Sequence, residues 1–277
     1  MRICDQITSR NNPKIKWVAS LTEKKRRAEN RSFFVEGEKL MIEAFSSGLP
    51  LTHLFIKAAD LERILALIKE KGINCDNDAI DVIPVSEEVF DKISTEKSPE
   101  GVITVIKYLD FFHYIDIIYK EEFFSSDKER VLALYSVRDP GNLGAVIRSA
   151  TAFGVDHVVL SSDCADIYNH KTVRAAMGSL FHIKVSIVED FKKFIQSAQS
   201  NGRRVYAAEL RDGAKALSDV DLSAKDIFVI GNEGHGIPED ISAECNGNVY
   251  IPISAKTESL NASVAAAVFM WEQNKIL

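Results

Sequence analysis

Apolar and polar residues alternate along the chain in two rhythms, one typical of strands and one of helices. Strand side chains repeat every two residues and helix side chains every 3.6, so short apolar runs predict strands and amphipathic stretches predict helices. In the first hundred residues the two kinds alternate, and the sequence predicts a compact α/β module. Its expected strands cover residues 32–37, 51–56, 81–86 and 101–107, and its expected helices cover residues 38–48, 59–72 and 86–93.

The same alternation restarts beyond residue 130 with stronger strand signals. β-Branched apolar runs alternating with helical patterns predict a parallel sheet that helices cover on both faces. The intervening stretch is first aromatic and then charged, which indicates a connecting segment. We therefore expect a domain over residues 1–107, a connecting segment over 108–129 and a second domain over 130–277. The expected strands of the second domain cover residues 131–137, 157–161, 182–188, 204–210, 227–231 and 248–253.

The composition is that of a globular protein, with 46% apolar and 27% charged residues. No stretch approaches the roughly 18 apolar residues of a membrane helix. The first residues show no apolar core of a secretion signal. The four cysteines are far apart and the six histidines are scattered, which favours a reducing compartment and argues against a metal site. We expect a cytoplasmic protein with no metal and no membrane partner.

The net charge of −6 is unevenly distributed. Residues 1–39 contain ten Lys or Arg against five Asp or Glu, a local charge of +5, so the remainder carries −11. Exposed charges act within a Debye length of about 8–10 Å, so a basic segment on an acidic body can still pair with phosphates. The alternative is that the stretch "EKKRRAENR" is simply a solvated helix face.

Three segments follow strands of the second domain, and ligands of parallel sheets bind at the carboxyl ends of the strands. The first, "VRDPGNLGAVIR" (residues 137–148), lacks the glycine spacing of a dinucleotide site. In the helix that it opens, Val146, Ala150 and Phe153 should face the core. Arg148 lies on another side among small residues, which suits a subunit contact or a phosphate site. A surface arginine paired with a nearby acid is the alternative.

The second segment, "IFVIGNEGHGIPED" (residues 227–240), runs from a buried strand through three glycines to a helix that Pro238 opens. Three glycines in six residues let the backbone pass close to a ligand or to another loop. Glu233 is the side chain in this segment that is clearly suited to a chemical role. His235, beside two glycines, is more often incidental.

The third segment, "VYIPISAKTESLNASVAAAVFMWEQ" (residues 249–273), is a strand, a loop and a helix that we expect to begin near Ser259. A simple role as the helix N-cap competes with any functional role for Ser259, because serine is a favoured cap. The helix is rich in alanine and should pack closely. Its expected core stripe is Leu260, Val264, Val268 and Trp271.

Together, and in this order, the three segments resemble the signature motifs of the SpoU, or TrmH-type, RNA ribose 2′-O-methyltransferases of the SPOUT superfamily. The stretches "DPGNLGAVIRSATAFGV", "VIGNEGHGIP" and "IPISAKTESLNASVAAA" carry the resemblance. Residues 171–185 resemble the family's helix between the first two motifs. The first domain, with "SRNNPKIKWVASLTEKKRRAENRSFFVEGEKLMIEA", looks like the L30e-like substrate-binding domain that often precedes it. Ala255 stands where the third motif usually has glycine.

The resemblance implies a C-terminal parallel-sheet α/β domain tied in a trefoil knot, after a smaller L30e-like α/β domain. It also implies S-adenosylmethionine bound by the second and third motifs, and a homodimer with active sites at its interface. By matching positions, Gly231, Ile251 and Leu260 are expected to line the adenosyl pocket. The residues expected at the methyl-transfer centre are Asn142, Arg148, Glu233, Ser259 and Asn261.

The function that the resemblance implies is methyl transfer from S-adenosylmethionine to a ribose 2′-hydroxyl. We expect ribosomal RNA as the substrate, because the additional domain suits recognition of a structured RNA, with transfer RNA as the nearest alternative. A non-catalytic RNA-binding or ribosome assembly factor is the rival from another class. A nucleotide-dependent oxidoreductase is excluded by the missing glycine fingerprint.

Overall fold

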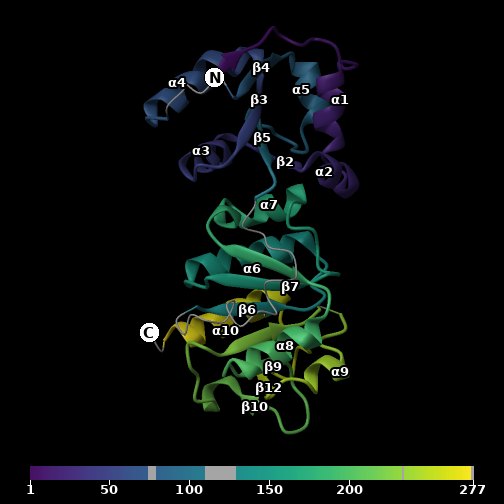
Figure 1. The fold of residues 1–277 in the computed structure, drawn as a ribbon, viewed down its shortest axis with the longest axis vertical. Helices are drawn as coiled ribbons and strands as arrows, with labels where there is room; N and C mark the ends of the chain where they lie inside the picture. Colours follow the sequence, from purple (N-terminus) through teal and green to yellow (C-terminus); the bar gives the residue numbers. More distant parts are fainter. Residues whose placement is uncertain (74–78, 110–128, 233, 276–277) are drawn as a thin grey trace. The chain divides into compact units, whose positions relative to one another are not determined.

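The structure is a computed structural model of the 277-residue chain (Figure 1). It describes residues 1–73, 79–109, 129–232 and 234–275. Most of the expected connecting segment (110–128) and the candidate residue Glu233 lie outside the described residues. The chain divides into two units, which we describe separately. The first unit is Met1–Leu109 with Tyr168–Phe181, and the second is Asp110–Ile167 with His182–Leu277.

The first unit is built on a five-stranded mixed sheet in the order β1-β4-β3-β5-β2. β3 runs parallel to β4 and antiparallel to β5, and β5 is antiparallel to β2. The central strands are buried on both faces, as their nearly continuous apolar sequences predict. The strands are Arg2–Ile3 (β1), Ser32–Glu36 (β2), Leu51–Lys57 (β3), Asp81–Val85 (β4) and Val102–Lys107 (β5).

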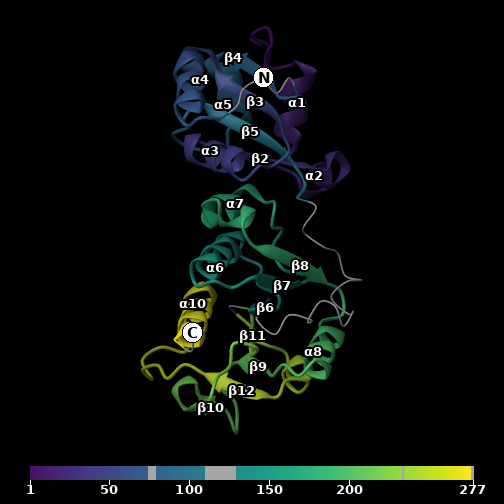
Figure 2. The same cartoon turned by 60° about the vertical axis from the view of Figure 1, so that its left-hand side comes forward.

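Helices cover both faces of this sheet. In Figures 1 and 2, α1 and α5 lie on one side and α3 and α4 on the other. Phe34, Phe55 and Phe90 are buried in a core that the sheet shares with α1 and α5. The helices are Pro13–Ser20 (α1), Lys24–Asn30 (α2), Glu38–Ser46 (α3), Leu61–Glu70 (α4), Glu87–Ile93 (α5) and His170–Ala176 (α7).

The basic N-terminal segment forms α1 and α2, two helices that the apolar pattern does not predict. Arg27 is only 2% exposed. Its Nη1 donates to the carbonyl oxygens of Leu21 and Thr22, at 2.8 and 2.7 Å. One cation of the basic stretch therefore fixes α2 to the turn that ends α1, while Lys24 and Lys25 face solvent.

Residues 168–181 pack with the first unit although they come much later in the chain. Tyr168 Oη accepts a hydrogen bond from the backbone N–H of Leu109, at 2.9 Å. Its ring stacks on Tyr108, with 4.1 Å between centroids, and contacts Phe33 at 4.6 Å. The boundaries expected from the sequence include this segment in the domain over 130–277. Those boundaries stay a prediction.

The second unit contains a seven-stranded sheet in the order β10-β12-β9-β11-β6-β7-β8. Every neighbouring pair is parallel, as the β-branched runs predict. The order places β12 inside the sheet, between β9 and β10. The strands are Val131–Leu134 (β6), His157–Ser161 (β7), Lys184–Val188 (β8), Val205–Ala208 (β9), Lys215–Ala216 (β10), Ile227–Ile230 (β11) and Gly247–Tyr250 (β12).

Helices lie on both sides of this sheet as well. Figure 2 shows α6 and α10 on one side and α8 on the other. The packing of α10 on α6 and β11 brings the last helix against the first helix of the unit. The helices are Pro140–Ala152 (α6), Phe191–Ser200 (α8), Glu239–Ser242 (α9) and Ala262–Asn274 (α10). No described helix is both long and apolar enough to cross a membrane.

The expected core stripe of the last helix is wrong. Val264 is 49% exposed and Trp271 is 52% exposed, so neither faces the core. The face that contacts the rest of the unit consists of Ala262, Ala266, Phe269, Met270 and Gln273. Two apolar faces coexist on this helix, and the small residues of one of them allow the close approach to α6.

Candidate active site

The candidate residues lie in loops that leave the carboxyl ends of parallel strands. The first loop follows β6 and leads into α6, the second follows β11, and the third follows β12 and leads into α10. β6 and β11 are neighbours in the sheet, and β12 is separated from β11 only by β9. Because all these strands are parallel, their carboxyl ends meet at one edge of the sheet, where such folds bind ligands.

The first loop is organised by the cap of α6. Asp139 is the N-cap, and its Oδ1 accepts a hydrogen bond from the backbone N–H of Asn142 at 2.7 Å. Pro140 occupies the first turn, where its missing N–H costs nothing. In the helix, Val146 and Ala150 are fully buried and Phe153 is partly buried, in keeping with the predicted core face. The cap fixes the backbone that carries Asn142.

The first and third motifs meet through a side-chain hydrogen bond. Asn261 Nδ2 donates to Asn142 Oδ1 at 2.9 Å, across 119 positions of sequence. The same Asn261 side chain caps α10, since its Oδ1 accepts from the N–H of Ser263 at 2.9 Å and of Val264 at 3.4 Å. One amide group therefore fixes the start of α10 and ties it to the start of α6.

The cap of α10 is Asn261 and not Ser259, so the helix begins two to three residues later than the sequence predicts. Ser259 is exposed, and its carbonyl oxygen accepts from the Thr257 hydroxyl at 3.3 Å. The asparagine competes better because its amide satisfies two backbone N–H groups at once and still donates to Asn142. Ser259 is thereby left in the loop between β12 and α10, where a substrate can reach it.

The second loop is a tight turn, which we call the glycine turn: Gly231, Asn232, Gly234, His235 and Gly236. Asn232 and Gly236 exchange two backbone hydrogen bonds, at 3.1 and 3.0 Å. The turn is so close that a Cβ on Gly231 would lie 2.6 Å from the carbonyl carbon of Gly236 and 2.6 Å from Ile237 Cγ1. Only glycine fits at position 231.

Two of the expected adenosyl-pocket residues directly follow strands of the sheet, β11 and β12, which β9 separates. Gly231 comes directly after β11, and Ile251, partly buried, comes directly after β12. Leu260, also partly buried, precedes the cap of α10. β9 ends between β11 and β12, and just beyond it Leu210 is 74% exposed, a residue that the sequence reading missed. Leu210 thus leaves an apolar side chain exposed just past the carboxyl end of the strand between β11 and β12.

Arg148 is exposed on α6, and no side-chain hydrogen bond or ion pair joins its guanidinium to another described residue. It follows Asn142 by six residues on the same helix, and the half-buried Ala145 and exposed Ala152 stand at three and four positions from it. Its guanidinium is thus available to an anion, and its small neighbours leave room for one to approach.

A cluster of polar groups lies beside the first loop. Asp163 accepts hydrogen bonds from the hydroxyls of Ser136 and Ser161, both at 2.6 Å, and from Arg138 Nη2 at 3.0 Å. Burial alone would raise the pKa of Asp163, but these three donors outweigh it and hold the pKa below its ordinary value. The Asp163 carboxylate therefore anchors the residues just before Asp139.

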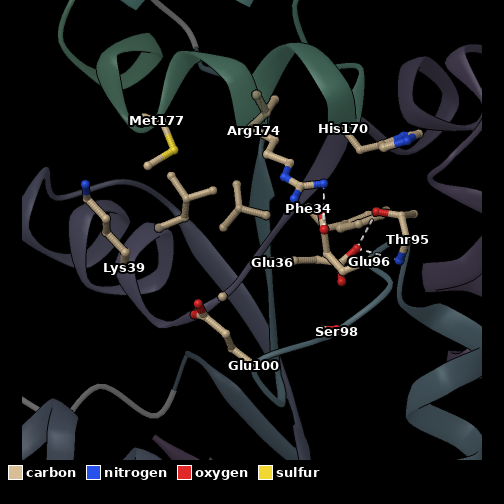
Figure 3. A pocket seen from close by; sticks show the side chains of 14 residues that line it. Phe34, Glu36, Lys39, Thr95, Glu96, Ser98, Glu100, His170, Arg174 and Met177 are labelled. Atoms are coloured by element: carbon tan, nitrogen blue, oxygen red, sulfur yellow. Dashed lines mark hydrogen bonds and ion pairs between the residues drawn. The ribbon is translucent and has the colours of Figure 1, made fainter. Parts of the chain in front are cut away.

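A separate cavity of about 240 Å³ lies in the first unit (Figure 3). Two of its acidic groups have polar partners: Arg174 pairs with Glu96 at 2.6 Å, and Glu36 accepts from the hydroxyls of Ser94 and Thr95. None of the residues predicted from the sequence lines it. Among the described residues, no cluster of His, Cys, Asp or Glu could hold a metal ion.

Two family models match the chain. Residues 129–271 match the SpoU rRNA Methylase family, and residues 12–104 match the MRM3-like substrate binding domain. A curated relative is the 23S rRNA (guanosine(2553)-2′-O)-methyltransferase RlmP of Bacillus subtilis. It is 33% identical over 266 residues, which is 96% of this chain and 98% of the relative.

Solved structures agree over the full length. An rRNA methyltransferase from Sinorhizobium meliloti is 29% identical and superposes with a TM-score of 0.82, over 100% of this chain and 99% of that one. A structure of an S-adenosylmethionine-bound rRNA methyltransferase from the same organism is 30% identical, again with a TM-score of 0.82, over 99% and 98% of the two chains.

Proposed function

Because the chain belongs to the SpoU rRNA methylase family, we propose that it transfers the methyl group of S-adenosylmethionine to a ribose 2′-hydroxyl of ribosomal RNA. The observation that carries the proposal is the bond between Asn142 and Asn261, which joins the first and third motifs at the sheet edge where the glycine turn lies. The substrate-binding domain matched at residues 12–104 supports a large structured RNA as substrate. Both the RNA and the cofactor are found in the cytoplasm, where we expect the protein to act.

The residues at the sheet edge fit the cofactor. The cradle at Gly231 admits no side chain, and the exposed Leu210 offers an apolar surface just past the end of β9, the strand that pairs with β11. Backbone groups of Gly231, Ile251 and Leu260 would hold the adenosyl part. The cofactor supplies an electrophilic methyl group on a sulfonium, and the protein must supply an aligned and activated hydroxyl.

Arg148 is the proposed activator of that hydroxyl. A guanidinium does not give up its proton readily, because its pKa exceeds about 12. We therefore assign it two other tasks: clamping the neighbouring phosphate and stabilising the alkoxide that develops as the proton passes to phosphate or water. Asn142, Ser259 and Asn261 orient the ribose and the loops, and positioning of this kind contributes up to about 7–11 kcal/mol in ideal cases. The role expected for Glu233, holding Arg148 or the second loop, falls on a residue outside those that the structure describes.

The test uses labelled S-adenosylmethionine, purified rRNA and tRNA, and mapping of the methylated position. We expect one 2′-O-methyl group in 23S rRNA, at a guanosine as the name of the Bacillus relative states for that protein. Labelling of tRNA alone would favour the alternative substrate. Failure to bind S-adenosylmethionine in a titration would favour a non-catalytic assembly factor.

Arg148→Ala should lower methyl transfer by about 100-fold or more while S-adenosylmethionine still binds, because the guanidinium acts on the hydroxyl and not on the cofactor. Arg148→Lys keeps the charge but loses the planar fork of the guanidinium. Its methyl-transfer rate should therefore lie between those of the unaltered protein and Arg148→Ala. A transfer rate in Arg148→Ala equal to that of the unaltered protein would refute the assignment.

We further propose that two copies of the chain form a dimer through α6 and α10, which would place the active sites at the interface. The support is the apolar surface on α10, where Val264 and Trp271 are about half exposed and Trp271 contacts Phe153 with 6.0 Å between ring centroids. Sedimentation velocity should give a dimer, and Val264→Asp should shift it to monomers with reduced methyl transfer. A monomer without the substitution would overturn the proposal. The trefoil knot and the domain limits at 107 and 130 stay predictions.

A further inference from the structure

The glycine turn is joined to the loop after β6 by one side chain, Asn232. Its Nδ2 donates to the carbonyl oxygen of Ser136 at 2.8 Å, across 96 positions of sequence. β11 and β6 are adjacent strands, so this bond links the first loops beyond their carboxyl ends. The bond therefore fixes the distance between a loop of the second motif and a loop of the first.

The other end of the same amide shapes the glycine turn. Asn232 Oδ1 accepts from the backbone N–H of Gly234 at 2.8 Å and of His235 at 3.1 Å, and the His235 ring nitrogen Nδ1 lies 3.4 Å away. An asparagine that satisfies the next backbone amides stabilises a turn in place of a longer loop. The donor and the acceptor of Asn232 thus serve separate purposes, one between loops and one within a loop.

The carbonyl that Asn232 binds is itself held in place. Ser136 has a φ of 56°, a left-handed conformation that is rare for serine, and it is buried. Its N–H donates to Ser161 Oγ at 2.8 Å and its hydroxyl to Asp163 Oδ2 at 2.6 Å. Three residues later, Asp139 caps α6 and fixes Asn142. The bond from Asn232 thus reaches a rigid point directly ahead of the expected catalytic helix.

We propose that Asn232 is a positioning residue for methyl transfer: it aligns the glycine turn, which holds the cofactor, with the loop that carries Asn142, which orients the ribose. The inference rests on the proposed function. Its distinctive consequence is that the two halves of one amide affect two different steps. The acceptor half governs cofactor binding through the shape of the turn, and the donor half governs the rate of transfer through the spacing of the loops.

Two substitutions separate the halves. Asn232→Asp keeps an acceptor for Gly234 and His235 but places a carboxylate oxygen against the Ser136 carbonyl oxygen, which repels it. We expect S-adenosylmethionine affinity within about threefold of the unaltered protein and kcat lower by about tenfold, the effect of one lost hydrogen bond to a neutral partner with some added repulsion. Asn232→Ala loses both halves, so affinity and kcat should both fall by about tenfold.

The matched control is Asn201→Asp at the end of α8. Asn201 Nδ2 also donates to a backbone carbonyl oxygen, that of Ser197 at 2.8 Å, but within its own helix. This variant should keep both parameters. Thermal unfolding of all variants is measured alongside, and hydrogen exchange is followed in peptides covering residues 132–139 and 231–237. Exchange should rise in both peptides for Asn232→Asp and in neither for Asn201→Asp.

The outcomes distinguish failure of the positioning role of Asn232 from failure of the proposed function. Two results for Asn232→Asp would overturn the positioning role. One is an unaltered kcat, and the other is a loss of affinity as large as the loss of kcat, together with a lower melting temperature. Absence of methyl transfer in the unaltered protein would overturn the proposed function, while the exchange data would still decide whether Asn232 joins the two loops.

Discussion

Substituting Gly231 by alanine tests the close approach in the glycine turn. The added methyl group would lie 2.6 Å from the carbonyl carbon of Gly236, 2.7 Å from its oxygen and 2.6 Å from Ile237 Cγ1. Carbon atoms in contact prefer about 3.5–4.0 Å, so neither strand of the turn can stay in place. Two of the three contacts are with backbone, which cannot rotate away as a side chain can.

The size of the expected loss of stability follows from the part of the glycine turn that must move. The backbone pair between Asn232 and Gly236 has to open, and overpacking of a closely packed site costs about 1–3 kcal/mol. For a domain of this size, each kcal/mol lowers the melting temperature by about 2–4 °C, so we expect a fall of about 2–12 °C. S-adenosylmethionine affinity should fall by more than about tenfold, because opening the turn by 1 Å destroys the cradle.

Titration calorimetry and thermal unfolding measure both effects, and Gly234→Ala is the matched control. It lies in the same turn, but its Cβ would meet only Asn232 Oδ1 at 3.6 Å, an ordinary contact. We expect it to change the melting temperature by less than about 2 °C. Gly231→Ala with unaltered affinity and stability would refute the reasoning, and so would equal losses in both variants.

Two further predictions concern other parts of the second unit. The pKa of Glu129 is lowered to about 2, mainly by His157 at 3.8 Å and then by Lys184 at 3.1 Å. Glu129 therefore stabilises the fold fully above about pH 4.5, and progressively less as the pH falls towards 2. Glu129→Gln should therefore cost roughly 2 kcal/mol at pH 7 and little near pH 2.5; a constant difference in melting temperature across that range would contradict this. Asn261→Ser should keep the cap of α10 and the melting temperature but lower methyl transfer through loss of the bond to Asn142, whereas Asn261→Ala should also lose about 1 kcal/mol of stability. Transfer by Asn261→Ser at the unaltered rate would show that the bond is dispensable.

Strand positions and the parallel sheet could be predicted because buried strands leave a strong apolar signal. Their ends could not. The predicted strand over 131–137 ends at Leu134, since Ser136 turns into the left-handed region to reach Ser161 and Asp163. That turn depends on partners in another loop, which a local pattern does not contain.

The orientation of the last helix was also beyond the sequence pattern. Both of its faces are apolar, so spacing alone cannot decide which one turns inward. The structure buries Ala266 and Phe269 and leaves Val264 exposed, because the small residues fit against α6. A stripe of large residues favours the core only when the competing face is polar.

The candidate site was predicted as a set of residues but not as a network. The bond between Asn142 and Asn261 joins positions that no periodicity relates. The residue types at this turn point to Glu233 and not to its neighbour Asn232, because a neutral amide carries no charge to suggest chemistry. The available signal was an asparagine directly after a strand and between glycines, a pattern typical of a side chain that shapes a turn.

The interior position of β12 has a consequence for biogenesis. β9 cannot pair with β12, its second neighbour, until residues 247–250 have been synthesised. Only then is the edge of the sheet complete at the carboxyl ends of the strands that precede Leu210 and Ile251. Such distant pairing is slow to form. We therefore expect a nascent chain to gain affinity for the methyl donor only after residues 247–250 have joined the sheet beside β9.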